Sequence, residues 1–125
     1  MNVVDSSAWM EYFIDGPNAA FFGGAIEDVS ALLVPTICIY EVFKKVLNDL
    51  GESEAFGVVS QMKLGRVVDI DEDVALSAAR ISIANKLPMA DSLILAVAQS
   101  AKATLWTQDE HFKGISGVKY RPKKK

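Results

Sequence analysis

Several acidic residues stand where predicted strands end or predicted helices begin. Asp5 ends the apolar run MNVV that opens the chain, and Asp109 follows a second such run, TLWT. Asp91 stands near the start of a helical stretch after Pro88. Carboxylates brought close together repel one another, and Mg²⁺ or Mn²⁺ relieves that repulsion because hard divalent ions favour carboxylate oxygen. These residues could therefore form a metal site for hydrolytic chemistry if the fold brings them to one place.

Asp5 and Asp109 also have local explanations that involve no metal. Asp5 or Ser6 could cap a helix that begins near Ala8, and Asp109 could form an Asx-turn. Taken singly, an acid at the end of a strand leaves the local role and the functional role equally open.

Asp91 is the most informative of the acids. As a charge near a helix start it would interact favourably with the helix dipole. However, the helical repeat puts it on the same side as Ile94, Leu95 and Ala98, which form an apolar stripe. A carboxylate that faces a core is unfavourable unless a cation or hydrogen-bond donors meet it. This position therefore favours a functional role.

Glu41 is a further acidic candidate, in a helix that follows another short apolar run. The helical repeat puts it on the side of Lys44, Lys45 and Asn48, opposite the apolar face. An exposed Glu41–Lys45 pair would contribute only about 0.2–0.5 kcal/mol. Against this, Glu41 is the only charge in the stretch TICIYEVF. Periodicity alone leaves its role undecided.

Short β-branched or aliphatic runs alternate with helical stretches along the chain. The expected strands are Met1–Val4, Leu32–Val34, Val67–Ile70 and Thr104–Thr107, with Val118–Tyr120 as a fifth. The expected helices run from an N-cap at Thr36 to Gly51, from a cap at Asp71 to Asn85, and onward from Pro88. This alternation predicts a single α/β domain over residues 1–125, with three α/β/α layers and a mostly parallel central sheet. Ligands of such sheets bind beyond the carboxyl ends of the strands, where Asp5 and Asp109 stand.

The composition narrows the class of protein. Half of the 125 residues are apolar, which favours a homo-oligomer or a protein partner that covers part of the surface. The net charge is only −3, and we expect the basic residues 119–125 to form a solvated end. Cys38 is the only cysteine, which argues against a disulfide framework and a Cys-based zinc site. No apolar run approaches the roughly 20 residues of a membrane helix and no secretory signal is evident, so we expect a soluble, cytoplasmic protein without membrane association.

Taken together, the acids and their sequence settings resemble the PIN-domain nucleases, and most closely the small VapC-type toxins of toxin–antitoxin pairs. The stretches that carry the resemblance are VVDSS, TICIYEVF, LPMADSLILAVA and LWTQDEHF. The family has an acid after the first strand, a Glu on a central helix, an Asp opening a late helix, and Thr-x-Asp after the next strand. Asp5, Glu41, Asp91 and Thr107–Asp109 occupy those positions, and the likeness covers nearly the whole chain. The sequence departs at His111, where the family often has a further Asp, and we expect this His to be a loop residue.

The resemblance implies a magnesium-dependent endoribonuclease in which a metal-activated water attacks an RNA phosphodiester. The catalytic set that it implies is Asp5, Glu41, Asp91 and Asp109, of which Asp5, Asp91 and Asp109 would hold Mg²⁺ or Mn²⁺. Glu41 would orient or deprotonate the attacking water. Ser6 and Thr107 would form hydrogen bonds with the carboxylates or with a water ligand.

The resemblance also implies partners. These are an RNA substrate, a cognate antitoxin whose C-terminal segment blocks the catalytic groove, and a second copy of the chain in a homodimer or higher oligomer. Arg80, Lys86 and the basic end could position RNA phosphates, although solvated faces are the simpler explanation. The aromatic residues Trp9, Tyr12 and Trp106 could stack on bases, but core packing explains them better.

Other functions remain as alternatives. A protein of this family could process RNA without an antitoxin, or could be a catalytically silent PIN fold that serves as a binding module. The intact set of acids argues against the silent module. A phospho-acceptor receiver domain has similar length, but it would need adjacent acids after the first strand and a Lys after the fifth. Here two serines follow Asp5, and no Lys follows TLWT.

Overall fold

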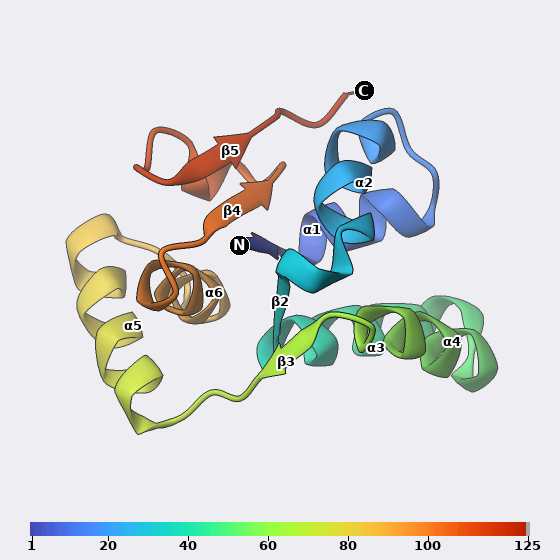
Figure 1. The fold of residues 1–125 in the computed structure, drawn as a ribbon, viewed down its shortest axis with the longest axis horizontal. Coiled ribbons are helices and arrows are strands. Elements are labelled where there is room, and N and C mark those ends of the chain that lie inside the picture. Colours follow the sequence, from blue (N-terminus) through green and yellow to red (C-terminus); the bar gives the residue numbers. More distant parts are fainter. Residues whose placement is uncertain (125) are drawn as a thin grey trace.

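Five short strands form one parallel sheet at the centre of the fold (Figure 1). The computed structural model describes residues 1–124. The strands are β1 (Asn2–Val4), β2 (Leu32–Pro35), β3 (Arg66–Val68), β4 (Thr104–Thr107) and β5 (Val118–Tyr120), in the spatial order β3-β2-β1-β4-β5. Every neighbouring pair is parallel, which confirms the predicted sheet and makes it wholly parallel. Because β1 is the central strand, the residues that follow β1 and β4 lie side by side.

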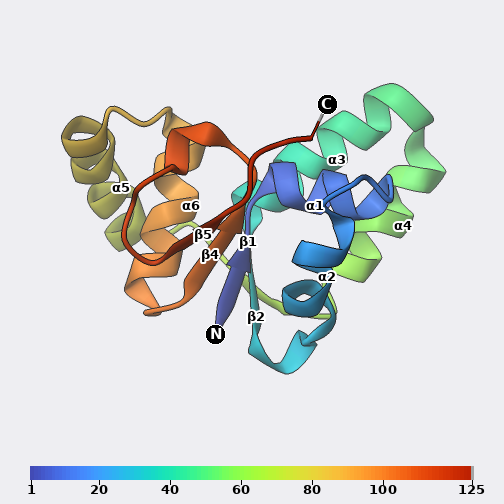
Figure 2. The same ribbon diagram turned by 90° about the horizontal axis from the view of Figure 1, so that it is seen from above.

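Helices cover the sheet as the predicted α/β/α layers require. They are α1 (Ser6–Phe13), α2 (Ala19–Glu27), α3 (Thr36–Leu50), α4 (Glu52–Met62), α5 (Glu72–Asn85) and α6 (Met89–Ser100), with 3₁₀ turns η1 (Val29–Ala31) and η2 (Glu110–Phe112). Figure 2 shows α5 and α6 on one side of the sheet and α1 and α2 on the other, with the α3–α4 hairpin beside α1. Within residues 1–124 no single helix is long and apolar enough to cross a membrane, although α5 and α6, bent by 114° at their break, reach that length and composition together.

Two helices and one cap differ from the sequence-based expectation. Helices α2 and α4 were not predicted, because α2 is apolar on nearly all sides and α4 begins directly after the Gly51 that ends α3. Thr36 is the first helical residue of α3 and not its N-cap, since β2 runs into the helix through the extended backbone of Pro35. The predicted cap at Asp71 is confirmed, because its side chain accepts a hydrogen bond from the Val74 N–H at 2.9 Å.

The aromatic residues considered for base stacking are engaged within the fold. Trp9 is buried, and the Tyr12 hydroxyl lies 3.0 Å from Oε2 of Glu27. Trp106 is half-buried, and its indole N–H donates to Oδ1 of Asn2 at 2.8 Å. These contacts agree with the expected core packing.

Candidate metal centre

Asp5 lies at the carboxyl edge of the sheet, between β1 and the start of α1. Its backbone N–H continues the β1–β4 pairing by donating to the Trp106 carbonyl at 3.1 Å. Its side chain is buried, and Oδ1 accepts hydrogen bonds from the Ala8 N–H at 3.0 Å and the Ser7 hydroxyl at 2.8 Å. Asp5 therefore caps α1, as its local explanation predicts. The second oxygen, Oδ2, accepts from the Thr107 hydroxyl at 2.7 Å, so the same carboxylate also faces the end of β4.

Asp109 reaches the same edge through Thr107. Its backbone N–H donates to the Thr107 hydroxyl oxygen at 2.9 Å, and that hydroxyl in turn donates to Asp5. The Asp109 side chain accepts from the His111 N–H at 2.9 Å and so caps η2, which is the turn that the local explanation predicts. Asp5 and Asp109 therefore each cap the element that follows them, and both also lie at the same edge of the sheet.

Asp91 and Asp109 meet at the side chain of His111. Nδ1 of His111 lies 2.8 Å from Oδ1 of Asp109 and 3.3 Å from Oδ2 of Asp91. One ligand atom from each of these three residues lies within 4.8 Å of the others, close enough to share one metal ion. His111 does lie in a turn, but its ring is directed at the acids, a role that the expectation of a simple loop residue missed. Asp5 is outside this closest group, although it belonged to the predicted metal set.

Glu41 approaches the cluster from α3. It is half-buried, and its Oε1 accepts a hydrogen bond from the Ser6 hydroxyl at 2.6 Å. Ser6 opens α1 directly after Asp5, so this bond ties α3 to the first turn of α1. Helical periodicity left Glu41 undecided because the group that holds it belongs to a different helix. The two polar residues predicted to support the acids, Ser6 and Thr107, thus each form a hydrogen bond with one of them.

The electrostatics of these side chains reflect burial and crowding of negative charge. Burial raises the pKa of Asp5 to about 7, against the lowering effect of its hydrogen bonds, and the charge of Asp109 adds to the rise. The pKa of Asp91 is raised to about 6, mainly by burial and further by Asp109 and Glu41, while His111 opposes the rise. A divalent cation would offset this concentration of negative charge, so the donor set fits a hard metal ion such as Mg²⁺ or Mn²⁺.

The acids also affect the pKa of a buried thiol. Cys38 of α3 is fully buried, and its sulfur lies 3.7 Å from the Val4 carbonyl at the end of β1. Its pKa is raised well above the ordinary value, first by burial and then by the charges of Asp5, Glu41 and Asp91. Three of the predicted acids therefore act electrostatically on the same buried thiol.

Two of the predicted RNA-contacting residues are exposed at helix α5. Arg80 is exposed on α5, and Lys86 is exposed at the C-terminal end of that helix. No side-chain hydrogen bond or ion pair within residues 1–124 joins either residue to the acids. Their proximity to a substrate stays a prediction.

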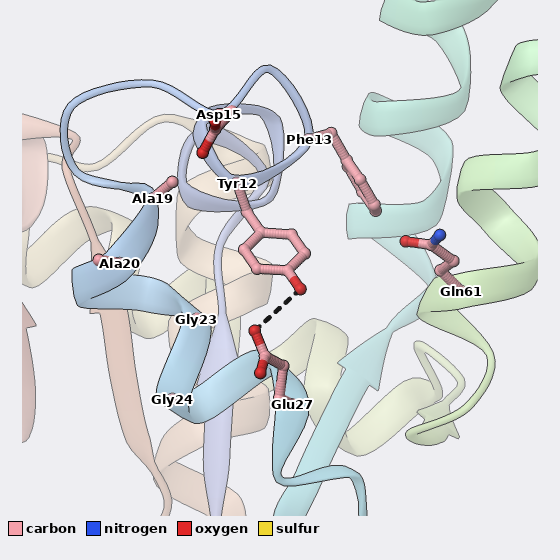
Figure 3. Close-up of a pocket in the computed structure, with 9 residues that line it drawn as sticks. All are labelled: Tyr12, Phe13, Asp15, Ala19, Ala20, Gly23, Gly24, Glu27 and Gln61. Carbon is pink, nitrogen blue, oxygen red and sulfur yellow. Dashed lines mark hydrogen bonds between the residues drawn. The ribbon is translucent and has the colours of Figure 1, made fainter.

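A separate pocket lies away from the acids (Figure 3). It is an open hollow of about 660 Å³ lined by the α1–α2 hairpin and Gln61 of α4. The hydrogen bond between Tyr12 and Glu27 lies within it. None of the acids of the candidate centre lines this pocket, so it is distinct from the metal centre.

Comparisons with known proteins place this fold in a family. In overall structure the chain is similar to a toxin–antitoxin complex from Klebsiella pneumoniae, with 22% identity, a TM-score of 0.80, and coverage of 95% of this chain and 96% of that chain. It is also similar to Mycobacterium tuberculosis VapC20, described as a sarcin-ricin loop cleaving toxin, with 14% identity, a TM-score of 0.79, and coverage of 98% and 100%. FitAcB from Neisseria gonorrhoeae is 23% identical with a TM-score of 0.72, and 96% of each chain is covered. A comparison with curated proteins gave no significant match. The family profile of the PIN domain matches residues 3–118, and the chain therefore belongs to the PIN domain family.

Proposed function

We propose that this protein is a metal-dependent endoribonuclease and the toxin of a toxin–antitoxin pair. The observation that carries the proposal is the convergence of Asp91 and Asp109 with Asp5 and Glu41 at the carboxyl edge of the sheet. Hydrolysis of a phosphodiester by a metal-activated water needs such a set of carboxylates at one point. Membership of the PIN domain family supports the nuclease activity.

Asp91 and Asp109 would hold a Mg²⁺ or Mn²⁺ ion, with Asp5 completing the acidic face behind them. When bound, the ion would stabilise charge on the phosphodiester and lower the pKa of a water. Thr107 donates to Asp5 and accepts from Asp109, so it fixes the relative positions of these two carboxylates. This arrangement keeps the metal-binding oxygens close together before any ion arrives.

Glu41 is the residue that we assign to the attacking water. Its Oε1 is held by the Ser6 hydroxyl, which leaves Oε2 free of any side-chain hydrogen bond within the described residues. A half-buried carboxylate at the edge of the acidic cluster can accept a proton from a water that attacks phosphorus. Ser6 thus acts by orienting Glu41.

The partners of the proposed function come from its structural relatives. VapC20 is described as cleaving the sarcin-ricin loop, and the Klebsiella relative was solved as a toxin–antitoxin complex. By extension, we assign an RNA substrate and a cognate antitoxin to this protein, acting in the cytoplasm. The proposed homodimer accounts for apolar side chains that remain exposed on the described surface.

The test is cleavage of a broad RNA pool by the purified protein with Mg²⁺, with Mn²⁺ and with a chelator. We expect cleavage that requires the ion and is lost in Asp91→Asn, since this change removes a carboxylate from the cluster. The matched control is Asp69→Asn, an exposed acid in the loop after β3, which should cleave as the wild type does. Equal cleavage by the wild type and Asp91→Asn would indicate a contaminating ribonuclease. Together with an absence of metal dependence, it would argue for a silent binding module.

A further inference from the structure

The chain segment after β5 is held against the sheet edge that carries the acids. We call residues 121–123 the strap. The Arg121 N–H donates to the Thr107 carbonyl at 3.0 Å, and the Arg121 guanidinium lies 4.0 Å from the ring centroid of Phe21. The Pro122 carbonyl accepts a hydrogen bond from Nδ2 of Asn18 at 3.0 Å. In Figure 1 the strap runs from β5 towards α2, and in Figure 2 it passes over the start of α1.

Asn18 ties the strap to the residues beside the metal centre. It is fully buried, and its Nδ2 also donates to Oε1 of Gln108 at 3.1 Å. Its backbone N–H donates to Oε2 of the buried Glu11 at 2.8 Å. Gln108 lies between Thr107 and Asp109, so one buried amide links the strap, the α1–α2 connection and the end of β4. Buried polar groups with several partners hold their neighbours in one arrangement.

The strap places Lys123 between two hollows that lead to the acids. One hollow, of about 410 Å³, is lined by Lys123 together with Asp109 and Ser7. The other, of about 510 Å³, is lined by Lys123 together with Glu41 and Ser6. Lys123 therefore lines both a hollow that reaches Asp109 and a hollow that reaches Glu41.

Charge distinguishes Lys123 from the other lysine in these hollows. Lys45 also lines the second hollow, but its ammonium is paired with Asp49 at 3.1 Å. Lys123 forms no ion pair among residues 1–124. An RNA strand that approaches a cluster of carboxylates needs a cation to hold its phosphates, because both partners are negatively charged.

We propose that Lys123, held by the strap, binds a phosphate of the RNA strand next to the one that is cleaved, and that Asn18 is the positioning residue that fixes the strap. This proposal rests on the proposed ribonuclease function. It assigns a role to part of the basic segment 119–125 that the sequence predicted to be a solvated end; of that segment, Lys125 lies outside the described residues.

The test measures binding of a short fluorescein-labelled single-stranded RNA by anisotropy over a range of salt concentrations. All variants carry Asp91→Asn, so that the RNA is not cleaved. For Lys123→Ala we expect the slope of log affinity against log salt to fall by about 0.7, the value for one phosphate contact on a single strand, which is about fivefold in affinity near 0.1 M salt. Lys123→Arg should bind as the parent does. Lys63→Ala removes an exposed lysine at the end of α4 and serves as the matched control.

The positioning role is tested with Asn18→Ser, which shortens the side chain that holds Pro122. We expect its slope of log affinity against log salt to fall by the same amount as in Lys123→Ala, although Lys123 is present. Thermal unfolding and circular dichroism show whether the variant folds. Should Asn18→Ser be unfolded, Gln108→Ala, which removes the acceptor that holds the Asn18 amide, provides the second test of positioning. Removal of residues 122–125, which takes away Lys123 itself, should lower the salt slope by at least as much as Lys123→Ala. An unchanged salt slope in Lys123→Ala, or tighter binding after removal of the segment, would overturn the proposal while the ribonuclease function stood. If the parent does not bind RNA at all, both proposals fail.

Discussion

Asp5 couples the pH dependence of folding to the candidate metal centre, because its carboxylate is buried at the sheet edge that carries the acids. In the metal-free protein its pKa is raised from 3.8 to about 7, so between those values the folded state binds more protons than the unfolded state. Stability from this group is full below about pH 4 and is lost as the pH rises towards about 7, by up to about 1.4 kcal/mol per pH unit. Asp91, raised to about 6, acts in the same direction.

We therefore expect the melting temperature of the chelated wild type to fall as the pH rises from about 4 to about 7, and Asp5→Asn to show a weaker fall. Added Mg²⁺ or Mn²⁺ should restore more stability at pH values above this range than below it, since protons compete with the ion. Differential scanning fluorimetry across the range measures both effects. Identical pH profiles for the wild type and Asp5→Asn would rule out this coupling.

At the residue scale, the sequence predicted the acids whose positions follow from the sheet. Asp5 and Asp109 follow neighbouring parallel strands, whose carboxyl ends meet at one edge of the sheet. The order of strands and helices in the sequence was therefore enough to predict their shared location. Glu41 could not be settled in this way, because its hydrogen bond comes from Ser6 on another helix. The approach of His111 to the acids depends on the η2 turn and its ring orientation, which no repeat in the sequence encodes. The assignment of metal ligands stays a prediction.

Thr107 links two acids through one hydroxyl, so its removal should affect both metal binding and folding. Thr107→Val keeps the shape but removes the donor to Asp5 and the acceptor for the Asp109 N–H. We expect metal affinity to fall about 10- to 100-fold, and the free energy of unfolding to fall by about 1–3 kcal/mol. Isothermal titration calorimetry and urea unfolding measure these changes. Thr104→Val on the same strand, where no side-chain hydrogen bond is formed within the described residues, should leave metal affinity unchanged.

His111 brings an imidazole nitrogen to a site otherwise built of carboxylates. Imidazole nitrogen suits later transition metals such as Ni²⁺, whereas carboxylate oxygen suits both Mg²⁺ and Mn²⁺. We therefore expect His111→Asp to shift the ratio of the Ni²⁺ and Mg²⁺ dissociation constants towards Mg²⁺ relative to the wild type. Calorimetric titration with each ion measures the ratio. Glu110→Gln, an exposed change in the same turn, should leave the ratio as it is, and an equal ratio in His111→Asp would exclude metal contact by the imidazole.

At the scale of elements, the junction between α3 and α4 shows why one helix was missed. Gly51 ends α3 and immediately precedes α4 with φ of +93°. A residue that both stops one helix and starts the next leaves no loop for a sequence pattern to reveal. The strap was also missed, because its anchor Asn18 is distant in sequence from Pro122 and is joined to it only by the fold.

Gly51 at this junction and Gly57 within α4 provide a matched pair of glycine substitutions. Gly51→Ala should lower the free energy of unfolding by about 1–3 kcal/mol, since L side chains rarely adopt this backbone conformation. Gly57→Ala, within α4 and with no atom close to the added Cβ, should raise it by about 0.5–1 kcal/mol. Urea unfolding of both variants checks the opposite signs. Equal effects would mean that the turn between α3 and α4 does not need glycine.

At the scale of the whole molecule, the core does not bury all the apolar residues of the chain. On α5, Leu76 and Ile83 are two helical turns apart and are 55% and 84% exposed, and Met89 at the start of α6 is 75% exposed. The helices that carry them, α5 and α6, lie on the side of the sheet opposite the α1–α2 hairpin (Figure 2). These side chains are the surface that we expect a second copy of the chain to cover in the proposed homodimer.

Ile83→Glu tests this expectation without disturbing the core. Because the side chain is 84% exposed, the melting temperature of dilute protein should change little. Burial of an isoleucine in an interface contributes about 1.5–3 kcal/mol, so its replacement by a charge should weaken dimerisation at least about tenfold. Sedimentation velocity over a concentration series measures the dissociation constant. Ile14→Glu, exposed at the end of α1 on the other side of the sheet, is the control. A dimer that weakens equally in both variants would place the interface elsewhere, and a monomeric wild type would exclude the homodimer.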